Sequence, residues 1–141
     1  MGERATKQKP NTAMNHRLVL DTDIVIWLLR KESQYVDTFL REQESGSSFL
    51  LSPIVSAEIY AGAFKKEYPL IQTLFNWFDP LTLDNDTGRM AGEYANSYKK
   101  SHNKISLEDY FLAASAKQEK ALLWTNNYKH YPMADIKFYK V

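Results

Sequence analysis

Short apolar runs alternate with helical patterns along most of this chain. Apolar runs of this length, bounded by turn residues, are typical of buried strands. We predict strands at 18–20, 48–51, 81–83, 121–125 and 136–139. Strands that alternate with helices form parallel sheets covered on both faces. The sequence therefore predicts a three-layer α/β/α domain with a central parallel sheet of four or five strands.

Capping residues mark the starts of the helices expected between these strands. Ser, Thr and Asp are preferred at helix N-caps, and proline is favoured at the first helical position. The candidate caps are Thr22 or Asp23, Ser33, Ser52 (followed by Pro53), Asp84 and Ser106. The apolar spacing then predicts helices over about 24–28, 34–40, 53–64, 67–78, 85–98 and 107–119.

One domain accounts for the length of 141 residues and the 44% hydrophobic composition. We expect residues 17–141 to form it and the polar residues 1–16 to be a disordered tail, with Met14 an alternative start of the natural chain. The absence of cysteine excludes disulfides and thiolate chemistry. No apolar run approaches the ~20 residues of a membrane helix. We expect a cytoplasmic protein without a membrane partner.

The charge is nearly balanced, with 18 basic and 17 acidic residues. The chain beyond residue 20 carries 14 basic and 16 acidic residues, so it has no general attraction for nucleic acid. Binding of a polyanion would need a local patch or a bound metal. Lys99, Lys100 and Lys104, with His102, form one basic cluster, which is either a solvated helix end or a phosphate contact.

Four polar side chains lie where chemistry is expected in a parallel sheet, near strand ends or helix starts: Asp21, Glu58, Asp109 and Asn127. Each also has a structural interpretation. Asp21 can cap a helix, Asp109 completes a capping box with Ser106, and Asn127 is suited to a turn. Glu58 shares a helical face with Ile54 and Val55, so we expect it to point inward, where an unpaired carboxylate is costly. Its structural interpretation is a glutamate at the rim of the core that pairs with an arginine.

Together these side chains predict a metal site. Carboxylates that converge at one sheet edge repel one another, and a divalent cation relieves that repulsion. Oxygen ligands suit Mg²⁺, with Mn²⁺ as the alternative. Metal-activated water attacking a phosphodiester is the chemistry such a site favours.

Four segments, in this order, resemble the motifs of PIN-domain ribonucleases: LVLDTD (18–23), SPIVSAEIYAG (52–62), DYFLAASA (109–116) and LWTNNYKHY (123–131). The short chain also looks like VapC, the toxin half of a toxin–antitoxin pair. The resemblance implies a Mg²⁺-dependent endoribonuclease that acts on RNA, forms a homodimer and is inhibited by a cognate antitoxin protein.

The same resemblance implies roles for individual residues. Asp21, Glu58 and Asp109 would form the acidic site, with Asp21 and Asp109 as metal ligands and Thr125 as a supporting hydroxyl. The fourth position is often Asp in this family but is Asn127 here, which puts a second metal ion in doubt. Asp23 lies near the same strand end and can compensate for the missing charge.

Two other readings remain open from the sequence. A haloacid-dehalogenase-type phosphatase would use Asp21 as a nucleophile and Asp23 as a general acid, but the chain has no aspartate between Leu123 and Asp135 to complete its later motif. A non-catalytic interaction module would instead use aromatic side chains as a partner surface: Phe64, Tyr68, Phe75 and Trp77. We expect those aromatics to lie in the core.

Overall fold

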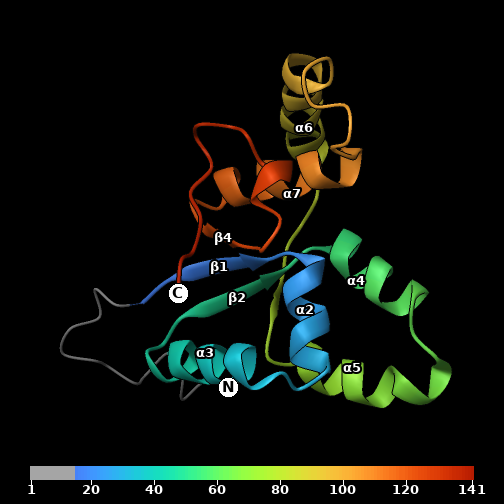
Figure 1. Cartoon of the computed structure of the whole chain (residues 1–141), viewed down its shortest axis with the longest axis vertical. Coiled ribbons are helices and arrows are strands. Elements are labelled where there is room, and N and C mark those ends of the chain that lie inside the picture. The colour runs from blue at the N-terminus through green and yellow to red at the C-terminus, as the bar shows by residue number, and fades with distance from the viewer. Residues whose placement is uncertain (1–14) are drawn as a thin grey trace.

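The computed structural model describes residues 15–141 (Figure 1). Most of the predicted tail, residues 1–14, lies outside the described residues. His16, which the prediction assigned to the tail, already belongs to the folded part: its backbone N donates to Ser47 Oγ at 2.9 Å, and its carbonyl accepts from Ser48 N. No helix in the described part of the chain has the length and apolar character needed to cross a bilayer.

The described residues form a four-stranded, all-parallel sheet in the order β3-β2-β1-β4. The strands are β1 (Arg17–Leu20), β2 (Ser48–Leu51), β3 (Asp79–Pro80) and β4 (Leu122–Trp124). This confirms the predicted fold class. The register places Leu18 opposite Phe49 on one side and Leu122 on the other, so the buried β1 is the centre of the sheet.

Two predicted strands differ from the structure. The strand expected at 81–83 is instead β3, two residues earlier and only two residues long. Pro80 is tolerated because β3 is an edge strand: proline has no backbone N–H, and on the outer side of an edge strand no neighbouring strand needs that donor. The strand expected at 136–139 is reduced to one parallel bridge between Leu123 and Phe138.

The helices are α2 (Thr22–Leu29), α3 (Ser33–Glu44), α4 (Pro53–Ala61), α5 (Tyr68–Phe75), α6 (Asn85–Tyr98) and α7 (Leu107–Gln118), with 3-10 turns η2 (Lys65–Glu67) and η3 (Tyr128–His130). Ser52, Asp84 and Ser106 are N-caps as predicted. Two caps differ. Asp21 rather than Thr22 or Asp23 caps α2, and Glu32 rather than Ser33 precedes α3.

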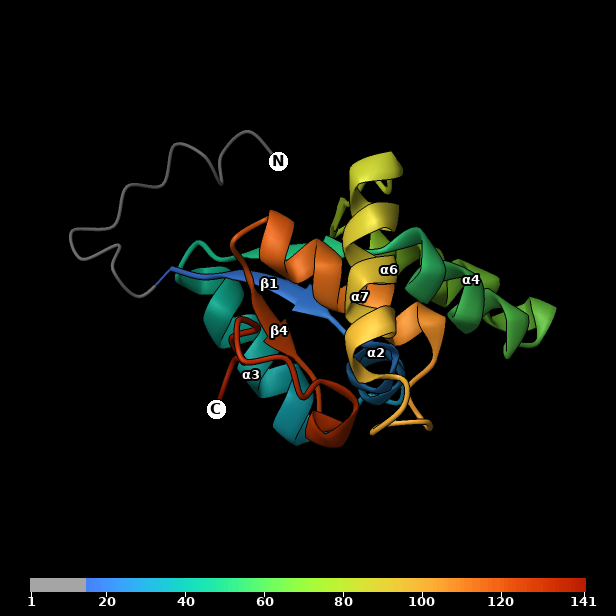
Figure 2. The same cartoon turned by 90° about the horizontal axis from the view of Figure 1, so that it is seen from above.

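Helices cover both faces of the sheet (Figure 1). On one face α7 packs on β1 and β4, and α6 crosses over α7 (Figure 2). On the other face lie α2, α3 and α5. Ala113, Ala114 and Ala116 are buried on α7, and these small side chains allow a close approach of helix and sheet. Because β1 ends at Leu20 and α2 starts at Thr22, Asp21 stands at the carboxyl edge of the sheet.

An aromatic cluster forms the core under α3 and α5. Phe49 is fully buried, and its ring centroid lies 4.4 Å from that of Phe39 and 6.2 Å from that of Phe78. The aromatics predicted to be core are partly misplaced: Phe64 is 72% exposed and Trp77 is 38% exposed. α5 ends at Phe75 instead of continuing to residue 78, so Trp77 leaves the helical face that the apolar spacing assumed.

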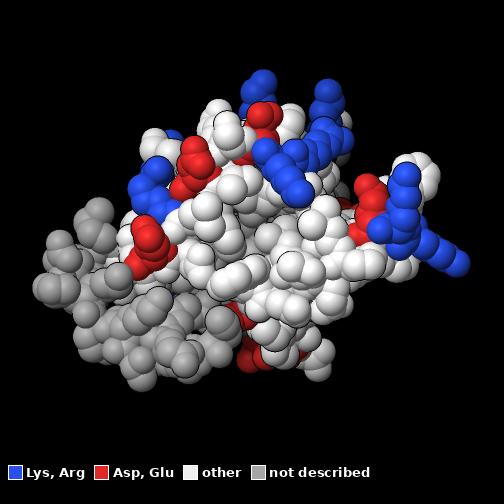
Figure 3. All heavy atoms as spheres, turned by 90° about the horizontal axis from the view of Figure 1, so that it is seen from below, with Lys and Arg blue, Asp and Glu red and all other residues white. Residues whose placement is uncertain are grey.

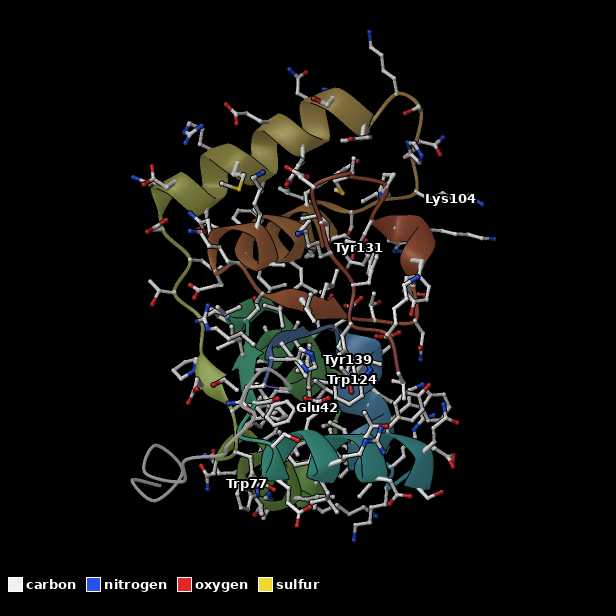
Figure 4. The ribbon with its side chains drawn as sticks, turned by 90° about the vertical axis from the view of Figure 1, so that its left-hand side faces the viewer. Glu42, Trp77, Lys104, Trp124, Tyr131 and Tyr139 are labelled. Atoms are coloured by element: carbon white, nitrogen blue, oxygen red, sulfur yellow. The ribbon has the colours of Figure 1, made fainter. Side chains whose placement is uncertain are left out.

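A second buried contact joins the two ends of the described chain. Glu42 on α3 accepts hydrogen bonds from Ser47 Oγ at 2.6 Å and from Tyr139 OH at 2.7 Å, and its Oε1 lies 3.0 Å from His16 Nδ1. Glu42, Tyr139 and Trp124 lie close together in Figure 4. Burial raises the pKa of Glu42, but these hydrogen bonds and His16 outweigh it, so the net shift of the pKa is downward.

We expect Glu42→Gln to lower the free energy of unfolding by ~1–2 kcal/mol at neutral pH, because a charged acceptor of several hydrogen bonds is lost. Since folding lowers the pKa of Glu42, its contribution is present above the unfolded pKa of ~4.5 and is lost as the pH falls below it. Urea unfolding of the wild-type protein should show a fall in the free energy of unfolding as the pH is lowered. The Glu42→Gln variant should show a smaller fall. Glu44→Gln, an exposed position on the same helix, is the control and should change neither quantity.

Candidate functional site

Asp21 is a buried carboxylate whose two oxygens are held by different partners. Its Oδ1 accepts from the backbone N of Thr22 at 2.8 Å, which makes it the N-cap of α2. Its Oδ2 accepts from Thr125 Oγ1 at 2.8 Å and from Tyr131 OH at 2.9 Å. The backbone N of Asp21 also donates to Trp124 O at 3.0 Å, which fixes the residue between β1 and β4. Asp21 is thus both a helix cap and a preorganised carboxylate at the sheet edge.

Asp109 lies opposite Asp21, at the start of α7. The capping box predicted from the sequence is present: Asp109 N donates to Ser106 Oγ at 3.2 Å, and Ser106 N donates to Asp109 Oδ2 at 3.3 Å. The same Oδ2 lies 3.0 Å from His130 Nδ1, while Oδ1 accepts from Tyr131 OH at 3.3 Å. The cap holds the Asp109 side chain in the direction of Asp21.

The Tyr131 hydroxyl lies between the two aspartates. Its distances of 2.9 Å to Asp21 Oδ2 and 3.3 Å to Asp109 Oδ1 mean that these oxygens are at most about 6.2 Å apart. Burial and the two nearby carboxylates raise the pKa of Tyr131, so its hydroxyl stays protonated and acts as a donor. The sequence predicted a cluster of carboxylates whose mutual repulsion only a cation would relieve. The structure corrects this, because hydroxyl groups and a histidine surround them.

Asp23 is the third carboxylate at this edge. Its Oδ1 accepts from Ile24 N at 2.8 Å, and its Oδ2 accepts from Asn126 N at 2.9 Å. Desolvation, followed by the charge of Asp21, raises the pKa of Asp23 to about 6 despite these hydrogen bonds. Asp23 therefore gives up its proton less readily than an ordinary aspartate, because burial, and then the charge of Asp21, disfavour its ionised form.

Glu58 does not point inward as predicted. Val55 and Ile59 are the buried residues of α4, whereas Glu58 is exposed. The helical stripe was assigned on the assumption that Ile54 faces the core, but Ile54 is only half-buried. Glu58 Oε1 accepts a hydrogen bond from Thr22 Oγ1, so Thr22 connects Glu58 to the N-terminus of α2 beside Asp21. Glu58 thus borders the site from the solvent side.

The segment after β4 supplies the remaining predicted residues. Thr125 is buried and donates to Asp21 Oδ2, and its Oγ1 accepts from the backbone N of Asn127 at 2.9 Å. Asn127 is exposed, and its backbone N, not its side chain, makes the hydrogen bond to the buried Thr125. The cluster of Lys99, Lys100 and Lys104 is exposed on the segment between α6 and α7 that leads to the α7 cap.

The oxygen donors at the site fit a hydrated Mg²⁺ or Mn²⁺ ion. Within residues 15–141 no three acidic or histidine side chains stand close enough together to enclose a metal ion. Mg²⁺ does not need such a cage, because it keeps several waters and is commonly bound by one or two carboxylates plus substrate phosphate. Asp21 and Asp109, with facing oxygens, are the pair that would hold it.

Three residues at the site were missed by sequence reasoning: Thr22, His130 and Tyr131. Both His130 and Tyr131 lie inside the segment that resembles the fourth motif, so their neighbourhood was identified but their contacts were not. A tyrosine or histidine after a strand is ordinary in a loop, and no periodic pattern marks it. Only the packing of this segment against Asp21 and Asp109 gives these side chains their place.

Comparisons with known proteins identify the family to which the chain belongs. A model of the PIN domain family matches residues 18–136. Ribonuclease VapC19 of Mycobacterium tuberculosis is 30% identical over 115 residues, which cover 82% of this chain and 92% of that protein. Ribonuclease VapC2 of Haemophilus influenzae is 28% identical over 120 residues, which cover 82% of this chain and 89% of that protein.

Solved structures share the fold. VapBC2 from Rickettsia felis, bound to a DNA fragment from their promoter, contains a chain with a TM-score of 0.75 and 22% identity, covering 87% of this chain and 97% of that one. VapBC-1 from nontypeable Haemophilus influenzae gives a TM-score of 0.75 and 22% identity, covering 88% and 97%. The match of residues 18–136 and the 30% identity to a VapC ribonuclease show that this chain belongs to the PIN domain family.

Proposed function

We propose that this protein is a Mg²⁺-dependent endoribonuclease and the toxin of a VapBC-type toxin–antitoxin pair. The observation that carries the proposal is the pair of carboxylates, Asp21 and Asp109, whose oxygens face each other at the carboxyl edge of the sheet. The names of its curated relatives, which are VapC ribonucleases, support RNA as the substrate.

The chain's own residues would divide the work at this site. Asp21 and Asp109 would hold the cation, which when bound supplies charge stabilisation and an activated water. Thr125 orients Asp21 through its hydroxyl, and exposed Glu58 is placed to accept a proton or position water on the solvent side. Lys99, Lys100 and Lys104 would contact the phosphates of RNA, which a nearly neutral protein otherwise does not attract.

Cleavage of an end-labelled single-stranded RNA by the purified full chain tests the proposal. We expect internal cleavage with Mg²⁺ or Mn²⁺ and none in EDTA, and restoration when the metal is returned. Undiminished cleavage in EDTA would contradict metal dependence. A stable phosphoaspartate formed from a phosphate ester would favour the phosphatase reading, and a folded protein without any cleavage would favour the non-catalytic module.

An antitoxin is the proposed protein partner. Seen from the side of α3 and α5, the middle of the surface carries neither Lys or Arg nor Asp or Glu, and charged side chains gather at its edges (Figure 3). A groove of about 460 Å³ on this side is lined mainly by apolar residues: Leu29, Val36, Leu40, Leu70, Leu74 and Trp77. Both solved relatives are toxin–antitoxin complexes, which supports such a partner. A stable complex with the product of the neighbouring short gene is expected in size-exclusion chromatography.

A second copy of the chain is the other proposed partner. An open groove of about 440 Å³ lies between α4 and the start of α7. Its apolar lining is Pro53, Ile54, Ala57, Leu107 and Phe111, and Glu58 and Glu108 complete it, so the dimer contact would border the acidic site. Leu107 is 57% exposed and adjoins the other apolar residues of this groove, and a contiguous exposed apolar patch is typical of an interaction surface. Light scattering of the purified protein should give the mass of a dimer; a monomer at all concentrations would contradict this assignment.

The identity of residue 127 sets the metal affinity in this proposal. A carboxamide adds no charge, so we expect one well-occupied ion and at most a weak second one. Asn127→Asp should bind Mn²⁺ severalfold more tightly because it adds a negative charge at the site. Titration calorimetry on the RNA-free protein measures this. Asn76→Asp is the control, because Asn76 precedes β3 at the opposite edge of the sheet. Equal Mn²⁺ affinity in the wild-type protein and Asn127→Asp would refute the role of residue 127.

A further inference from the structure

The Tyr131 hydroxyl carries one proton but lies within hydrogen-bond distance of two acceptors. It is 2.9 Å from Asp21 Oδ2 and 3.3 Å from Asp109 Oδ1. Tyr131 is only 2% exposed, and its position is fixed by its backbone N, which donates to Tyr128 O at 3.0 Å, and by an edge contact between its ring and Phe138. The buried ring therefore holds the hydroxyl donor beside the two carboxylates, whereas the hydroxyl of a surface tyrosine would be free to move.

The Asp21 oxygen that faces Asp109 has no acceptor capacity left. A carboxylate oxygen accepts about two hydrogen bonds, one for each lone pair. Asp21 Oδ2 already accepts from Thr125 and from Tyr131, whereas Oδ1 accepts from Thr22 N. A cation that binds Asp21 Oδ2 must therefore replace one of these hydroxyl donors.

The distances between the oxygens also indicate that a cation and the Tyr131 hydroxyl compete for the two carboxylates. Two ligands of one Mg²⁺ ion are no more than ~4.2 Å apart, because each lies ~2.1 Å from the metal. Asp21 Oδ2 and Asp109 Oδ1 are separated by a hydroxyl oxygen that lies 2.9 Å from one and 3.3 Å from the other. The tyrosine hydroxyl thus lies within hydrogen-bond distance of both oxygens that a bridging cation would bind, and it competes with the cation for them.

We propose that Tyr131 is a positioning residue that holds Asp21 and Asp109 together in the metal-free protein and competes with a divalent cation that binds Asp21 Oδ2 and Asp109 Oδ1. The inference rests on the proposed metal site. In the metal-free state the hydroxyl relieves the repulsion between the carboxylates. Metal binding then includes the loss of that hydrogen bond, so Tyr131 stabilises the empty site and weakens the affinity of the metal.

Tyr131→Phe tests the proposal because it removes the hydroxyl and keeps the ring. We expect Mn²⁺ to bind the RNA-free variant about tenfold more tightly, since the competing hydrogen bond to a charged group is gone. The metal-free variant should melt at a lower temperature than the wild-type protein, and saturating Mn²⁺ should raise its melting temperature by a larger amount. A hydroxyl that supports the ligands in the loaded site would give the opposite sign, because its loss would weaken binding.

Tyr139→Phe is the matched control. Tyr139 is also a buried tyrosine that donates to a carboxylate, but its acceptor is Glu42, and Figure 4 shows it apart from Tyr131. We expect Tyr139→Phe to lower the melting temperature and to leave the Mn²⁺ affinity unchanged. Equal or weaker Mn²⁺ binding by Tyr131→Phe would overturn the proposal.

A second measurement uses the wild-type protein and does not depend on how well the variant folds. Mn²⁺ titration should change the near-ultraviolet tyrosine absorption, because a buried hydroxyl loses a charged acceptor. Tyr139→Phe should retain this change and Tyr131→Phe should lack it. Mn²⁺ binding without any such change in absorption would overturn the role proposed for Tyr131 but not the metal-dependent function. No binding of Mn²⁺ by any of the three proteins would overturn both this proposal and the metal-dependent function.

Discussion

Asp109→Asn is expected to lower the rate of RNA cleavage about a thousandfold or more while the protein stays folded. Asp109 is the half-buried carboxylate that faces Asp21, and asparagine at this position keeps the shape but removes the charge that would hold the cation. Cleavage of labelled RNA at saturating Mg²⁺ measures the activity. Thermal unfolding without metal measures the stability.

The fold should tolerate this change. Asp109 is the N3 residue of the capping box whose N-cap is Ser106, and the asparagine carbonyl oxygen can still accept from Ser106 N, so the change should cost ~1 kcal/mol at most. Removing one of two facing carboxylate charges offsets part of that cost. Asp84→Asn is the control: Asp84 is the N-cap aspartate of the capping box with Thr87 at the start of α6, and it has no part in the site. Full nuclease activity in Asp109→Asn would mean that Asp109 is only a cap.

The positions of Asp21 and Asp109 could be predicted because local rules fix them. Asp21 follows a buried apolar run, and Asp109 follows a serine cap at the capping-box spacing. Parallel strands bring such residues to one edge of the sheet whatever the details of packing. The convergence of these two residues therefore follows from the alternation of strands and helices.

The position of Glu58 and the contacts of Tyr131 could not be predicted in the same way. A helical stripe shows which residues share a face, but the neighbouring elements decide how much of that face is covered. On α4 only Val55 and Ile59 are buried, which leaves Glu58 exposed. Tyr131 acts on Asp21 across 110 residues of sequence, from a segment that has no helical or strand pattern. Such a contact depends on tertiary packing alone.

The aromatic residues show the same limit on prediction and lead to a test of the core. Phe49 lies in β2 opposite Leu18 of β1, with no exposure to solvent, and contacts Phe39 and Phe78. Phe64 precedes η2 and is 72% exposed. The residue type alone does not distinguish these two phenylalanines, but the fold buries Phe49 and exposes Phe64 to solvent.

Phe49→Ala should therefore lower the free energy of unfolding by ~3–5 kcal/mol, because the apolar contacts are lost and the surrounding rings cannot close the cavity. That is a large share of the ~5–15 kcal/mol that stabilises a typical domain. Phe64→Ala should change the same quantity by only ~0.5 kcal/mol. Urea unfolding of the two variants beside the wild-type protein measures both values. Because Phe49 supports β2 next to β1, the strand that ends at Asp21, Phe49→Ala should also lose nuclease activity at lower temperatures than Phe64→Ala. Equal losses of stability in the two variants would contradict the placement of Phe49 in the core.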